Sequence, residues 1–340
     1  MRVAVVGATG AVGQQMLSIL EERKFPVSHL RVFASARSSE KKILFADRDW
    51  SCEILKSGCF EKTELVFFDA SDAVSKEWVP QALAAGAWVV DHSAAFRMDS
   101  QVPLAVPEIN GDEIDQLVAQ GKQRLVSGPN CSTVQITMAL KPILDCFGLK
   151  RVLISTYQSV SGAGAAAMQE LIFQTHRVLH GEPAKPSVFP HPIAFNCIPQ
   201  IGSIQSDGYT SEEQKIMEEV RKILNLSHLK ISATAIRVPT LNCHAASVQV
   251  ECEREPELKK VREALSKMPG VLLLDDSKQG EYPMNLSFVG KDLVGVGRIR
   301  KDPALDHGLS FWVVADNLRK GAALNAVQIG ERICLKNTRQ

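Results

Sequence analysis

The first part of the chain alternates short apolar runs with amphipathic stretches. An apolar run at residues 3–6 leads through a glycine-rich turn into a segment whose apolar positions recur at helical spacing. Further apolar runs at 65–70 and 87–94 flank a helical stretch at 76–85. This alternation predicts a parallel sheet with helices on both faces, whose ligands bind beyond the carboxyl ends of the strands. We therefore expect the loops SDAV, SAAFRM and SGPNC to face one crevice.

From about residue 150 the hydrophobic period changes to two. RVLISTYQSV, HLKISATAIRVPT and HAASVQVECE alternate as half-buried antiparallel strands do, and SFVGKDLVGVGRIRKD has the pattern of strands with glycine-marked turns. Helices are predicted at AAAMQELIFQTHRVL, SEEQKIMEEVRKIL and ADNLRKGAALNAVQIGERI. The proline-rich passage at 181–203 is too irregular for a single element. The pattern predicts a mixed α+β domain around a largely antiparallel sheet.

These two patterns predict an α/β chain of two domains. We expect residues 1–128 to form a Rossmann-like dinucleotide-binding domain that is completed by a C-terminal helix at 315–336, and residues 129–314 to form the mixed domain. A chain of 340 residues with 45% hydrophobic and 23% charged residues can bury two ordinary cores.

Composition and charge argue against several classes of function. The net charge is +1 and no run of Lys or Arg is present, so nothing points to nucleic acid or to an anionic membrane surface. No apolar stretch reaches the roughly 18 residues of a membrane span, and the chain opens on a strand-like run without a basic leader, so we expect a cytoplasmic protein. The eight cysteines form no CxxC pair, which favours reduced thiols over a disulfide framework or a zinc site.

The turn GATGAVG has the strand, turn and helix context of a dinucleotide fingerprint. The first glycine permits the tight turn, the second lets backbone N–H groups approach a pyrophosphate, and the third allows close helix packing. The phosphate would lie on the positive end of the helix. The alternative is a glycine-rich turn without a ligand. The predicted cofactor-binding residues of this turn are Gly7, Thr9, Gly10, Ala11, Val12 and Gly13.

The second predicted strand ends in ARSS at 36–39. An NAD-specific enzyme usually places Asp or Glu here to hold the ribose 2′-hydroxyl, whereas Arg37 and Ser38 offer a cation and a hydroxyl that suit a 2′-phosphate. The pattern favours NADP, and a solvated arginine on a surface turn is the alternative.

Cys131 lies where a loop is predicted to become a helix. Pro129 fixes the approach, Asn130 can cap the helix, and Pro142 should kink or end it. The helix end favours a thiolate, and a nearby histidine can take the proton. Beside a nucleotide crevice, a thiolate suggests aldehyde or acyl chemistry through a hemithioacetal and a thioester. A buried cysteine that only fills space is the other interpretation, and this stretch alone does not decide.

Most of the chain resembles the aspartate-semialdehyde dehydrogenases. The matching segments follow the family's order: GATGAVG, SAAFRM, VPLAVPEIN, GPNCSTVQ, TYQSVSGAG, IAFNCIPQI, EEQK, RVP with a histidine seven positions past its arginine, and ADNLRKGAALNAVQI. A set of this length is highly specific. The resemblance implies that residues 129–314 form a catalytic and dimerisation domain, and that the protein is a homodimer or a dimer of dimers without a catalytic metal.

The resemblance also implies a role for each matched residue in the reaction. Cys131 would be the nucleophile, His244 the acid/base partner, and Gln158 the residue that orients the acyl group. Glu213 would hold the substrate's amino group, and Arg237 would bind its α-carboxylate as a bidentate donor. Taken singly, Glu213 also fits an ordinary acidic first turn of a helix.

Two further sets of residues follow from the same resemblance. Inorganic phosphate or the acyl phosphate would bind at Arg97, Asn130 and Lys215. The nicotinamide side of NADP would contact Ser161 and Gly162, with Asn317 and Gln328 as weaker cofactor candidates.

The implied activity is the reversible, NADP-dependent reductive dephosphorylation of L-aspartyl 4-phosphate to L-aspartate 4-semialdehyde and phosphate through a cysteine thioester. In this family the product leads to lysine and diaminopimelate, threonine, methionine and isoleucine. One alternative is a related reductase acting on N-acetylglutamyl phosphate, which lacks the free ammonium that Glu213 would hold. The other is a non-catalytic relative acting as a binding protein, against which the presence of Cys131, Gln158, Arg237 and His244 argues.

Overall fold

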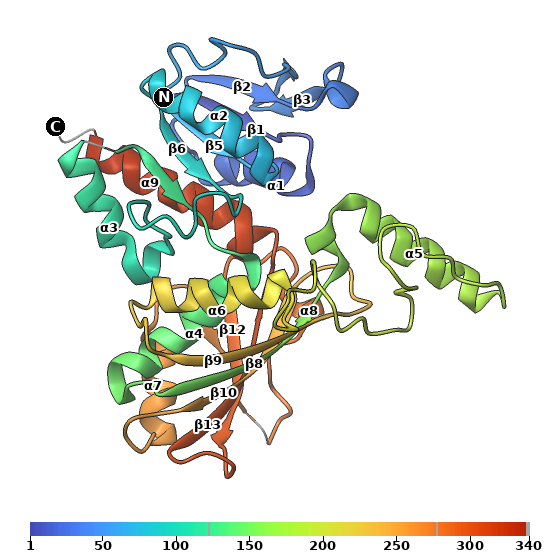
Figure 1. The fold of residues 1–340 in the computed structure, drawn as a ribbon, viewed down its shortest axis with the longest axis vertical. Helices are drawn as coiled ribbons and strands as arrows, with labels where there is room; N and C mark the ends of the chain where they lie inside the picture. The colour runs from blue at the N-terminus through green and yellow to red at the C-terminus, as the bar shows by residue number, and fades with distance from the viewer. Residues whose placement is uncertain (122, 277, 338–340) are drawn as a thin grey trace. The chain divides into compact units, whose positions relative to one another are not determined.

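The computed structural model describes residues 1–121, 123–276 and 278–337, and the chain divides into two compact units (Figure 1). The first unit comprises Met1–Asn130 and the described residues from Ala322 onward, and the second comprises Cys131–Gly321. No helix among the described residues is long and apolar enough to cross a membrane.

The first unit is built on a parallel sheet with the strand order β2-β1-β5-β6-β7. Its strands are β1 (Arg2–Val6), β2 (His29–Phe33), β5 (Leu65–Phe68), β6 (Trp88–Asp91) and β7 (Leu125–Ser127). A separate antiparallel hairpin consists of β3 (Lys42–Phe45) and β4 (Arg48–Ser51). The predicted Rossmann-like parallel sheet is confirmed.

Both faces of this sheet are buried, which explains the continuous apolar runs of its strands. Val3 and Val5 of β1 pack in one core cluster with Val327, whereas Ala4 and Val6 belong to a second cluster with Val79. Burying each such side chain stabilises the fold by about 1.5–3 kcal/mol. The helices are α1 (Ala11–Glu22), α2 (Asp72–Ala84), α3 (Pro107–Gln120) and α9 (Leu324–Asn337), with a 3-10 turn η1 (Ala36–Ser38).

The C-terminal helix begins later than predicted. The expected helix at 315–336 starts inside a strand, β13 (Gly308–Ala315), which is followed by a π-helical turn η3 (Arg319–Ala323) and only then by α9. The stretch was misassigned because its polar residues resemble the exposed face of an amphipathic helix, whereas Asp316, Asn317, Arg319 and Lys320 are buried.

The second unit contains a mixed sheet with the order β11-β12-β13-β10-β8-β9. β10 (His244–Glu251) pairs antiparallel with β8 (Arg151–Gln158) and β13, and β13 pairs antiparallel with β12 (Val294–Lys301). The edge pairs are parallel: β8 with β9 (Lys230–Arg237), and β12 with β11 (Val271–Leu273). The mixed sheet is confirmed.

Two details of that prediction are wrong. The stretches that form β8 and β9 run parallel, since the chain between them makes a long crossover through α5 (Ala165–Leu179) and α6 (Ser211–Ile223). The residues before Val294 form part of a short helix, α8 (Asn285–Phe288), and a turn, so only the later part of SFVGKDLVGVGRIRKD is a strand.

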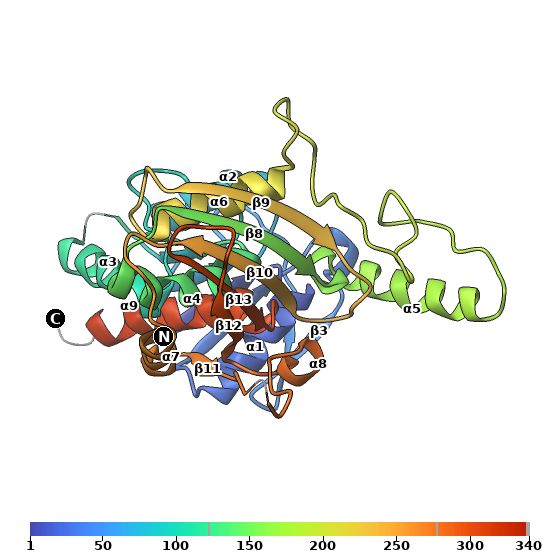
Figure 2. The same ribbon diagram turned by 90° about the horizontal axis from the view of Figure 1, so that it is seen from below.

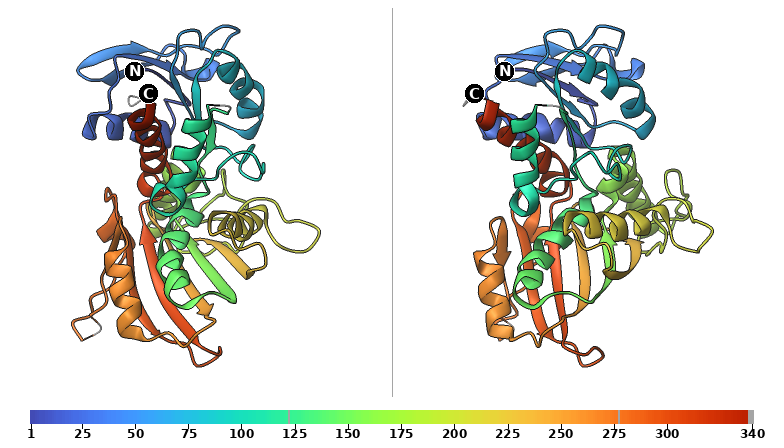
Figure 3. Two further views of the ribbon diagram at one scale, coloured as in Figure 1. Left: turned by 90° about the vertical axis from the view of Figure 1, so that its left-hand side faces the viewer. Right: turned by 60° about the vertical axis from the view of Figure 1, so that its left-hand side comes forward.

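Three helices pack side by side on one face of this sheet (Figures 2 and 3). α6 contacts β9 at one edge, α4 (Cys131–Phe147) contacts β10, β12 and β13, and α7 (Leu258–Lys267) contacts β11 and β12. α4 continues through Pro142 to Phe147, so this proline does not end the helix. The first residue of α4 is Cys131, as the sequence predicts.

Candidate active site

Three predicted site residues occupy one row across the sheet of the second unit. Gln158 on β8 is the register partner of Arg237 on β9 and of His244 on β10. Register partners point to the same face of a sheet, and here that face is covered by α4 and α6. The three side chains are only 1%, 6% and 0% exposed, respectively, so their polar groups require partners inside the protein.

Cys131 stands at the N-terminus of the 17-residue helix α4 and is partly exposed. The helix end stabilises a negative charge there. The thiol also interacts electrostatically with Arg237: burial lowers the pKa of this arginine, while Cys131 and Glu212 raise it. Gly321 packs against the cysteine, because a Cβ at this glycine would lie 3.1 Å from the Cβ and from the carbonyl oxygen of Cys131.

The imidazole of His244 is fully buried and tied to Ser159. The backbone N–H of Ser159 donates to His244 Nδ1 over 3.1 Å, and the Ser159 hydroxyl lies 3.1 Å from the same nitrogen. Burial, together with the charge of Arg237, lowers the pKa of His244 to about 3. The ring is therefore neutral at physiological pH.

Ser159 and Asn317 form hydrogen bonds with the residues that surround His244 and Arg237. The carbonyl of Ser159 accepts a hydrogen bond of 2.7 Å from Arg237 Nη1. Asn317 Oδ1 accepts from the Ser159 hydroxyl at 3.2 Å, from the Ser161 hydroxyl at 3.1 Å, and from the N–H of Cys243 at 3.0 Å. Asn317 and Ser161, expected to contact a cofactor, thus already brace the site internally. Sequence reasoning missed Ser159, whose backbone N–H leaves no signal in the sequence.

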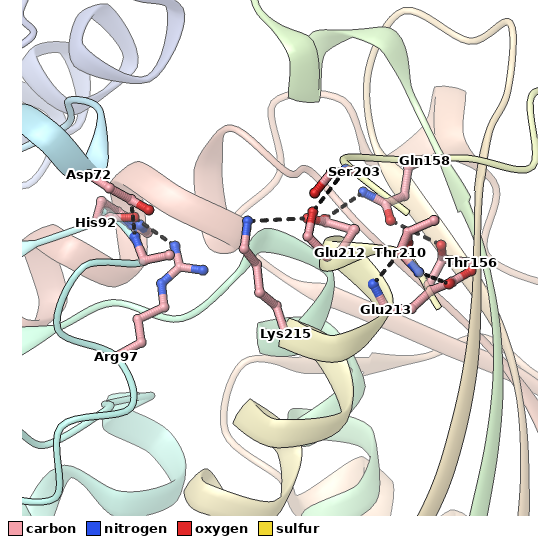
Figure 4. A network of polar contacts seen from close by, with 12 residues as sticks. Asp72, His92, Arg97, Thr156, Gln158, Ser203, Thr210, Glu212, Glu213 and Lys215 are labelled. Atoms are coloured by element: carbon pink, nitrogen blue, oxygen red, sulfur yellow. Dashed lines mark hydrogen bonds and ion pairs between the residues drawn. The ribbon is translucent and has the colours of Figure 1, made fainter. Parts of the chain in front are cut away.

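The two adjacent glutamates of α6 have different environments (Figure 4). Glu213 accepts from the N–H of Thr210 at 2.6 Å and from the N–H of Ala235 at 2.9 Å, and it forms a capping box with Thr210. Both carboxylate oxygens of Glu213 therefore bind backbone groups. Glu212 instead accepts from Gln158 Nε2 at 3.2 Å and lies 4.0 Å from Lys215 Nζ.

The structure thus distinguishes the two glutamates by their contacts, and which of them binds the substrate remains a prediction. Glu213 ties α6 to β9, and Glu212, which the sequence did not single out, borders the row of Gln158 and Arg237. Successive helical residues point about 100° apart, and two neighbouring acids look alike in a sequence until the phase of the helix is known. The Thr210-x-x-Glu213 spacing was the one available signal, because it is that of a capping box.

The predicted phosphate-binding residues are divided between the two units. Lys215 belongs to the second unit, one turn along α6 from Glu212. Arg97 and Asn130 belong to the first unit and are buried. Arg97 donates to the carbonyl of His92 at 2.6 Å (Figure 4), and burial lowers the pKa of His92 to about 4. A joint anion site of these three residues remains a prediction.

The glycine-rich turn of the first unit has the geometry of a phosphate-binding turn. Gly7 has φ = 87°, and a Cβ there would lie 1.9 Å from the carbonyl oxygen of Asp69. A Cβ at Gly13 would lie 2.3 Å from the carbonyl oxygen of Gly7. Gly10 is the N-cap of α1 and provides no side-chain cap, so the first N–H groups of the helix are presented to an anion. The turn therefore fits a dinucleotide.

Asp69 is a second residue that the sequence did not single out. A backbone hydrogen bond from Gly13 favours its ionised form, but burial and the negative charge of Asp91 raise its pKa to about 6. Asp69, which directly follows β5, thus places a carboxyl group with a pKa of about 6 against the turn.

The remaining cofactor candidates occupy the expected elements. Thr9, Ala11 and Val12 lie in the turn and the start of α1, and Arg37 and Ser38 lie in η1 directly after β2. Arg37 is exposed, which is compatible with binding a 2′-phosphate and with a solvated arginine. Gly162 packs against His244 and Arg237, because a Cβ there would lie 3.0 Å from Nε2 and 3.1 Å from Nη1.

Gln328, the weakest cofactor candidate, lies on α9. Its Nε2 donates to the carboxylate of Glu108 on α3 over 2.9 Å. This contact joins two helices that pack together in the first unit. A role of Gln328 in cofactor binding remains a prediction.

Comparison with known proteins places this arrangement among one family of enzymes. A semialdehyde dehydrogenase NAD-binding domain matches residues 2–117, and a semialdehyde dehydrogenase dimerisation domain matches residues 140–320. The chain is 47% identical over 332 residues to the aspartate-semialdehyde dehydrogenase of Aquifex aeolicus, with 97% of each chain covered. The crystal structure of aspartate semialdehyde dehydrogenase II from Vibrio cholerae matches with a TM-score of 0.94 at 41% identity, and its complex with ASA matches with 0.93 at 40%; each match covers 98% of both chains.

Proposed function

The chain belongs to the aspartate-semialdehyde dehydrogenase family of oxidoreductases, and on that premise we propose that it reductively dephosphorylates L-aspartyl 4-phosphate to L-aspartate 4-semialdehyde and phosphate. The reaction is reversible and uses NADP. It takes place in the cytoplasm and supplies the synthesis of lysine and diaminopimelate, threonine, methionine and isoleucine.

The observation that carries this proposal is the row of Arg237, Gln158 and His244 next to the helix that begins at Cys131. Arg237 and Cys131 interact electrostatically, so a cation suited to a carboxylate lies close to the nucleophile. Glu212 on the neighbouring helix contacts Gln158 and provides a negative charge for an ammonium group. An amino acid with both charges suits these three groups.

In the proposed mechanism the thiolate of Cys131 attacks the acyl phosphate. Phosphate departs, and the acyl group remains on the cysteine as a thioester. Gln158 orients the acyl group, Arg237 binds the α-carboxylate, and Glu212 takes the place expected for Glu213 in holding the amino group. Bound NADPH supplies the hydride that reduces the thioester. The resulting hemithioacetal collapses to the aldehyde with the help of His244 as the acid/base partner, and this step regenerates the thiolate.

Other residues would bind phosphate and the cofactor. The leaving phosphate would be held by Arg97, Asn130 and Lys215. The pyrophosphate would lie on the N–H groups of the turn from Gly7 to Gly13, with Arg37 and Ser38 at the 2′-phosphate. The nicotinamide would lie near Ser161, Gly162 and Asn317.

For assembly we propose a homodimer or a dimer of dimers. The sheet face of the second unit opposite α4 carries half-buried Tyr157 and Trp312, whose rings are 5.3 Å apart, and half-buried Leu153. This apolar surface supports pairing with a second copy. Light scattering coupled to size-exclusion chromatography measures the state, and a monomer at micromolar concentration would contradict the proposal.

The decisive experiment follows NADPH absorbance after aspartate semialdehyde and phosphate are added to the pure protein. We expect phosphate-dependent NADPH formation, and little with N-acetylglutamate semialdehyde, because that substrate has no ammonium for Glu212. A preference for the acetylated aldehyde would support the related reductase. Absence of turnover with either aldehyde would support the binding-protein alternative.

A further inference from the structure

The carboxyl group of Asp69 lies against the glycine-rich turn of the first unit. Asp69 directly follows β5, and its backbone N–H donates to the carbonyl of Val6 at the end of β1 over 2.9 Å. Its carbonyl oxygen would lie 1.9 Å from a Cβ at Gly7, and its Oδ2 would lie 3.7 Å from a Cβ at Gly10. The carboxylate also accepts a hydrogen bond from the N–H of Gly13. The backbone and the side chain of Asp69 are therefore both fixed against the turn.

This position is also where the phosphates of a dinucleotide are expected. In the strand order β2-β1-β5-β6-β7 the chain leaves β1 to one side for β2 and reaches β5 on the other side, so the crevice beyond β1 and β5 is the switch point at which ligands bind. Gly13 is the third residue of α1, and the first N–H groups of this helix would hold the diphosphate. Asp69 binds one of these N–H groups, so the diphosphate and the carboxyl group would share one helix end.

The charged side chain that acts on Asp69 is a second acid. Burial raises the pKa of Asp69 most strongly, and the negative charge of Asp91, the last residue of β6, raises it further, to about 6 in total. Asp91 is buried and accepts hydrogen bonds of 2.7 Å from the hydroxyls of Ser75 and Ser93. Arg97 acts on Asp91, whereas across the described residues no lysine or arginine contributes to the pKa of Asp69. No cation therefore balances an ionised Asp69.

The elements around Asp69 carry their other charges elsewhere. Among the described side chains, these charged groups lie at the far ends of their elements, at exposed positions or in ion pairs of their own: Arg2 on β1, Glu21 and Glu22 on α1, Asp72, Lys76 and Glu77 on α2, and Glu331 and Arg332 on α9. The first turn of α1 contains no acidic residue. The positive end of this helix is thus the group that opposes the charge of Asp69.

A diphosphate at this helix end would face the carboxyl group of Asp69. Two negative groups that share a partly buried helix end repel each other strongly, and the repulsion favours the neutral form of the carboxyl group. A protonated carboxyl group still has an oxygen that accepts the N–H of Gly13, while its O–H can donate to a phosphate oxygen. The protonated form of Asp69 therefore suits a bound diphosphate, and the ionised form does not.

We propose that Asp69 binds the cofactor in its protonated form, with one carboxyl oxygen accepting the N–H of Gly13 and the O–H donating to the diphosphate of the dinucleotide. Above the pH at which free Asp69 ionises, binding of the dinucleotide then takes up a proton from solvent at this residue, and no other bond is made or broken. This inference deepens the proposed function and rests on it for the cofactor.

The direction of the pH dependence follows from linkage. In the free protein Asp69 is protonated below about pH 6 and ionised above it. Binding therefore needs no proton uptake at Asp69 in acid, whereas above pH 6 the dissociation constant rises up to about tenfold per pH unit until the pKa of Asp69 in the complex is reached. A nearby diphosphate should raise this pKa by about one to two units. The dissociation constant should then increase about 10- to 100-fold between pH 5.5 and pH 8.5.

Isothermal titration calorimetry of NADP⁺ binding to the full-length protein tests this at pH 5.5 and pH 8.5. Asp69→Asn keeps the size of the side chain and an oxygen for Gly13, but it cannot ionise. We expect similar dissociation constants for the two proteins at pH 5.5, and about 10- to 100-fold tighter binding by Asp69→Asn at pH 8.5. The 2′-phosphate of NADP⁺ titrates near pH 6 as well, and its effect cancels because both proteins bind the same ligand.

The matched control is Asp47→Asn, the same change at an exposed aspartate in the turn between β3 and β4. This variant should follow the wild-type curve at both pH values. Parallel curves for wild type and Asp69→Asn, or weaker binding by Asp69→Asn at pH 8.5, would overturn the inference.

The proton itself can be counted at pH 7. The enthalpy of NADP⁺ binding, measured in buffers with different enthalpies of ionisation, gives the number of protons taken up as the slope. Wild type should take up about 0.4–0.8 proton more than Asp69→Asn, because Asp69 is mostly ionised in the free protein and mostly protonated in the complex. Equal proton counts would contradict the inference.

These measurements also separate the inference from the proposed function. They use no substrate, so they hold whichever aldehyde the protein reduces. Binding of NADP⁺ with the same pH dependence in wild type and Asp69→Asn would overturn the inference alone. Absence of binding at both pH values in both proteins would contradict the cofactor assignment as well.

Discussion

The glycine-rich turn of the first unit and the row of Gln158, Arg237 and His244 in the second differ in how their parts are brought together. The turn is seven consecutive residues whose geometry follows from local chemistry, since Gly7 has a positive φ and no room for a Cβ. The row depends on the register of three strands that are far apart in the sequence. A site built from consecutive residues, such as the turn, can therefore be recognised from a motif. In a site built from separate strands, such as the row, the sequence alone does not show which of two neighbouring residues faces the site.

The largest effect is expected at the first residue of α4, Cys131, which we propose as the nucleophile. Cys131→Ala should lower turnover by at least about 10⁴-fold, because no other group can carry the acyl intermediate. The measurement is phosphate-dependent NADPH formation from aspartate semialdehyde. The control is Cys146→Ala, at an exposed cysteine of the same helix, and it should retain normal activity. Comparable turnover in Cys131→Ala would refute the covalent mechanism.

In the glycine-rich turn, the largest effect is expected from a substitution that the backbone conformation does not tolerate. Gly7→Ala should destabilise the protein by about 3 kcal/mol, because the new Cβ meets the Asp69 carbonyl and φ is positive. Urea unfolding measures this loss, and NADP binding should weaken with it. Gly10→Ala is the matched control, since its Cβ would lie 3.2 Å from the nearest atom and its φ is ordinary. Equal stability of the two variants would show that the turn is not constrained as described.

Substitutions of the two adjacent glutamates of α6 test which of them binds the amino group of the substrate. Glu212→Gln should raise KM for aspartate semialdehyde about 10- to 100-fold with little change in stability, since it removes a charge close to Gln158. Glu213→Gln should instead lower the free energy of unfolding by about 1–2 kcal/mol, because it weakens two backbone hydrogen bonds and a capping box. The reverse pattern would restore Glu213 as the substrate residue.

The smallest effect concerns the pH dependence of the first unit. Asp69 has a pKa of about 6 in the folded protein, above its ordinary value of 3.8, so its contribution to stability is complete below about pH 4 and is lost as pH rises through 6. Asp69→Asn should therefore be relatively more stable at pH 8 than at pH 4. Urea midpoints that respond equally to pH in both proteins would contradict this.

The sequence predicted more of the fold than of the fine structure of the site. The parallel sheet, the mixed sheet, α5, α6 and the start of α4 at Cys131 followed from hydrophobic period and capping signals. The direction of the β8–β9 pair did not, because alternation does not encode strand direction. The late start of α9 did not either, because the polar residues just before it look like the exposed face of a helix although they are buried. The sequence also did not show that Glu212, rather than Glu213, contacts Gln158, since this depends on helix phase relative to the sheet.

By itself, the sequence determined the family, the glycine turn and the residue types of the chemistry, since each of these is written in short segments with a fixed spacing. Only the tertiary structure decided which glutamate borders Gln158 and which backbone amide contacts the ring of His244. Both outcomes depend on where a backbone amide points: the N–H of Ala235 and that of Thr210 bind Glu213, and the N–H of Ser159 binds His244. Every residue except proline carries the same amide, so its direction becomes visible only when the strands and helices are in place.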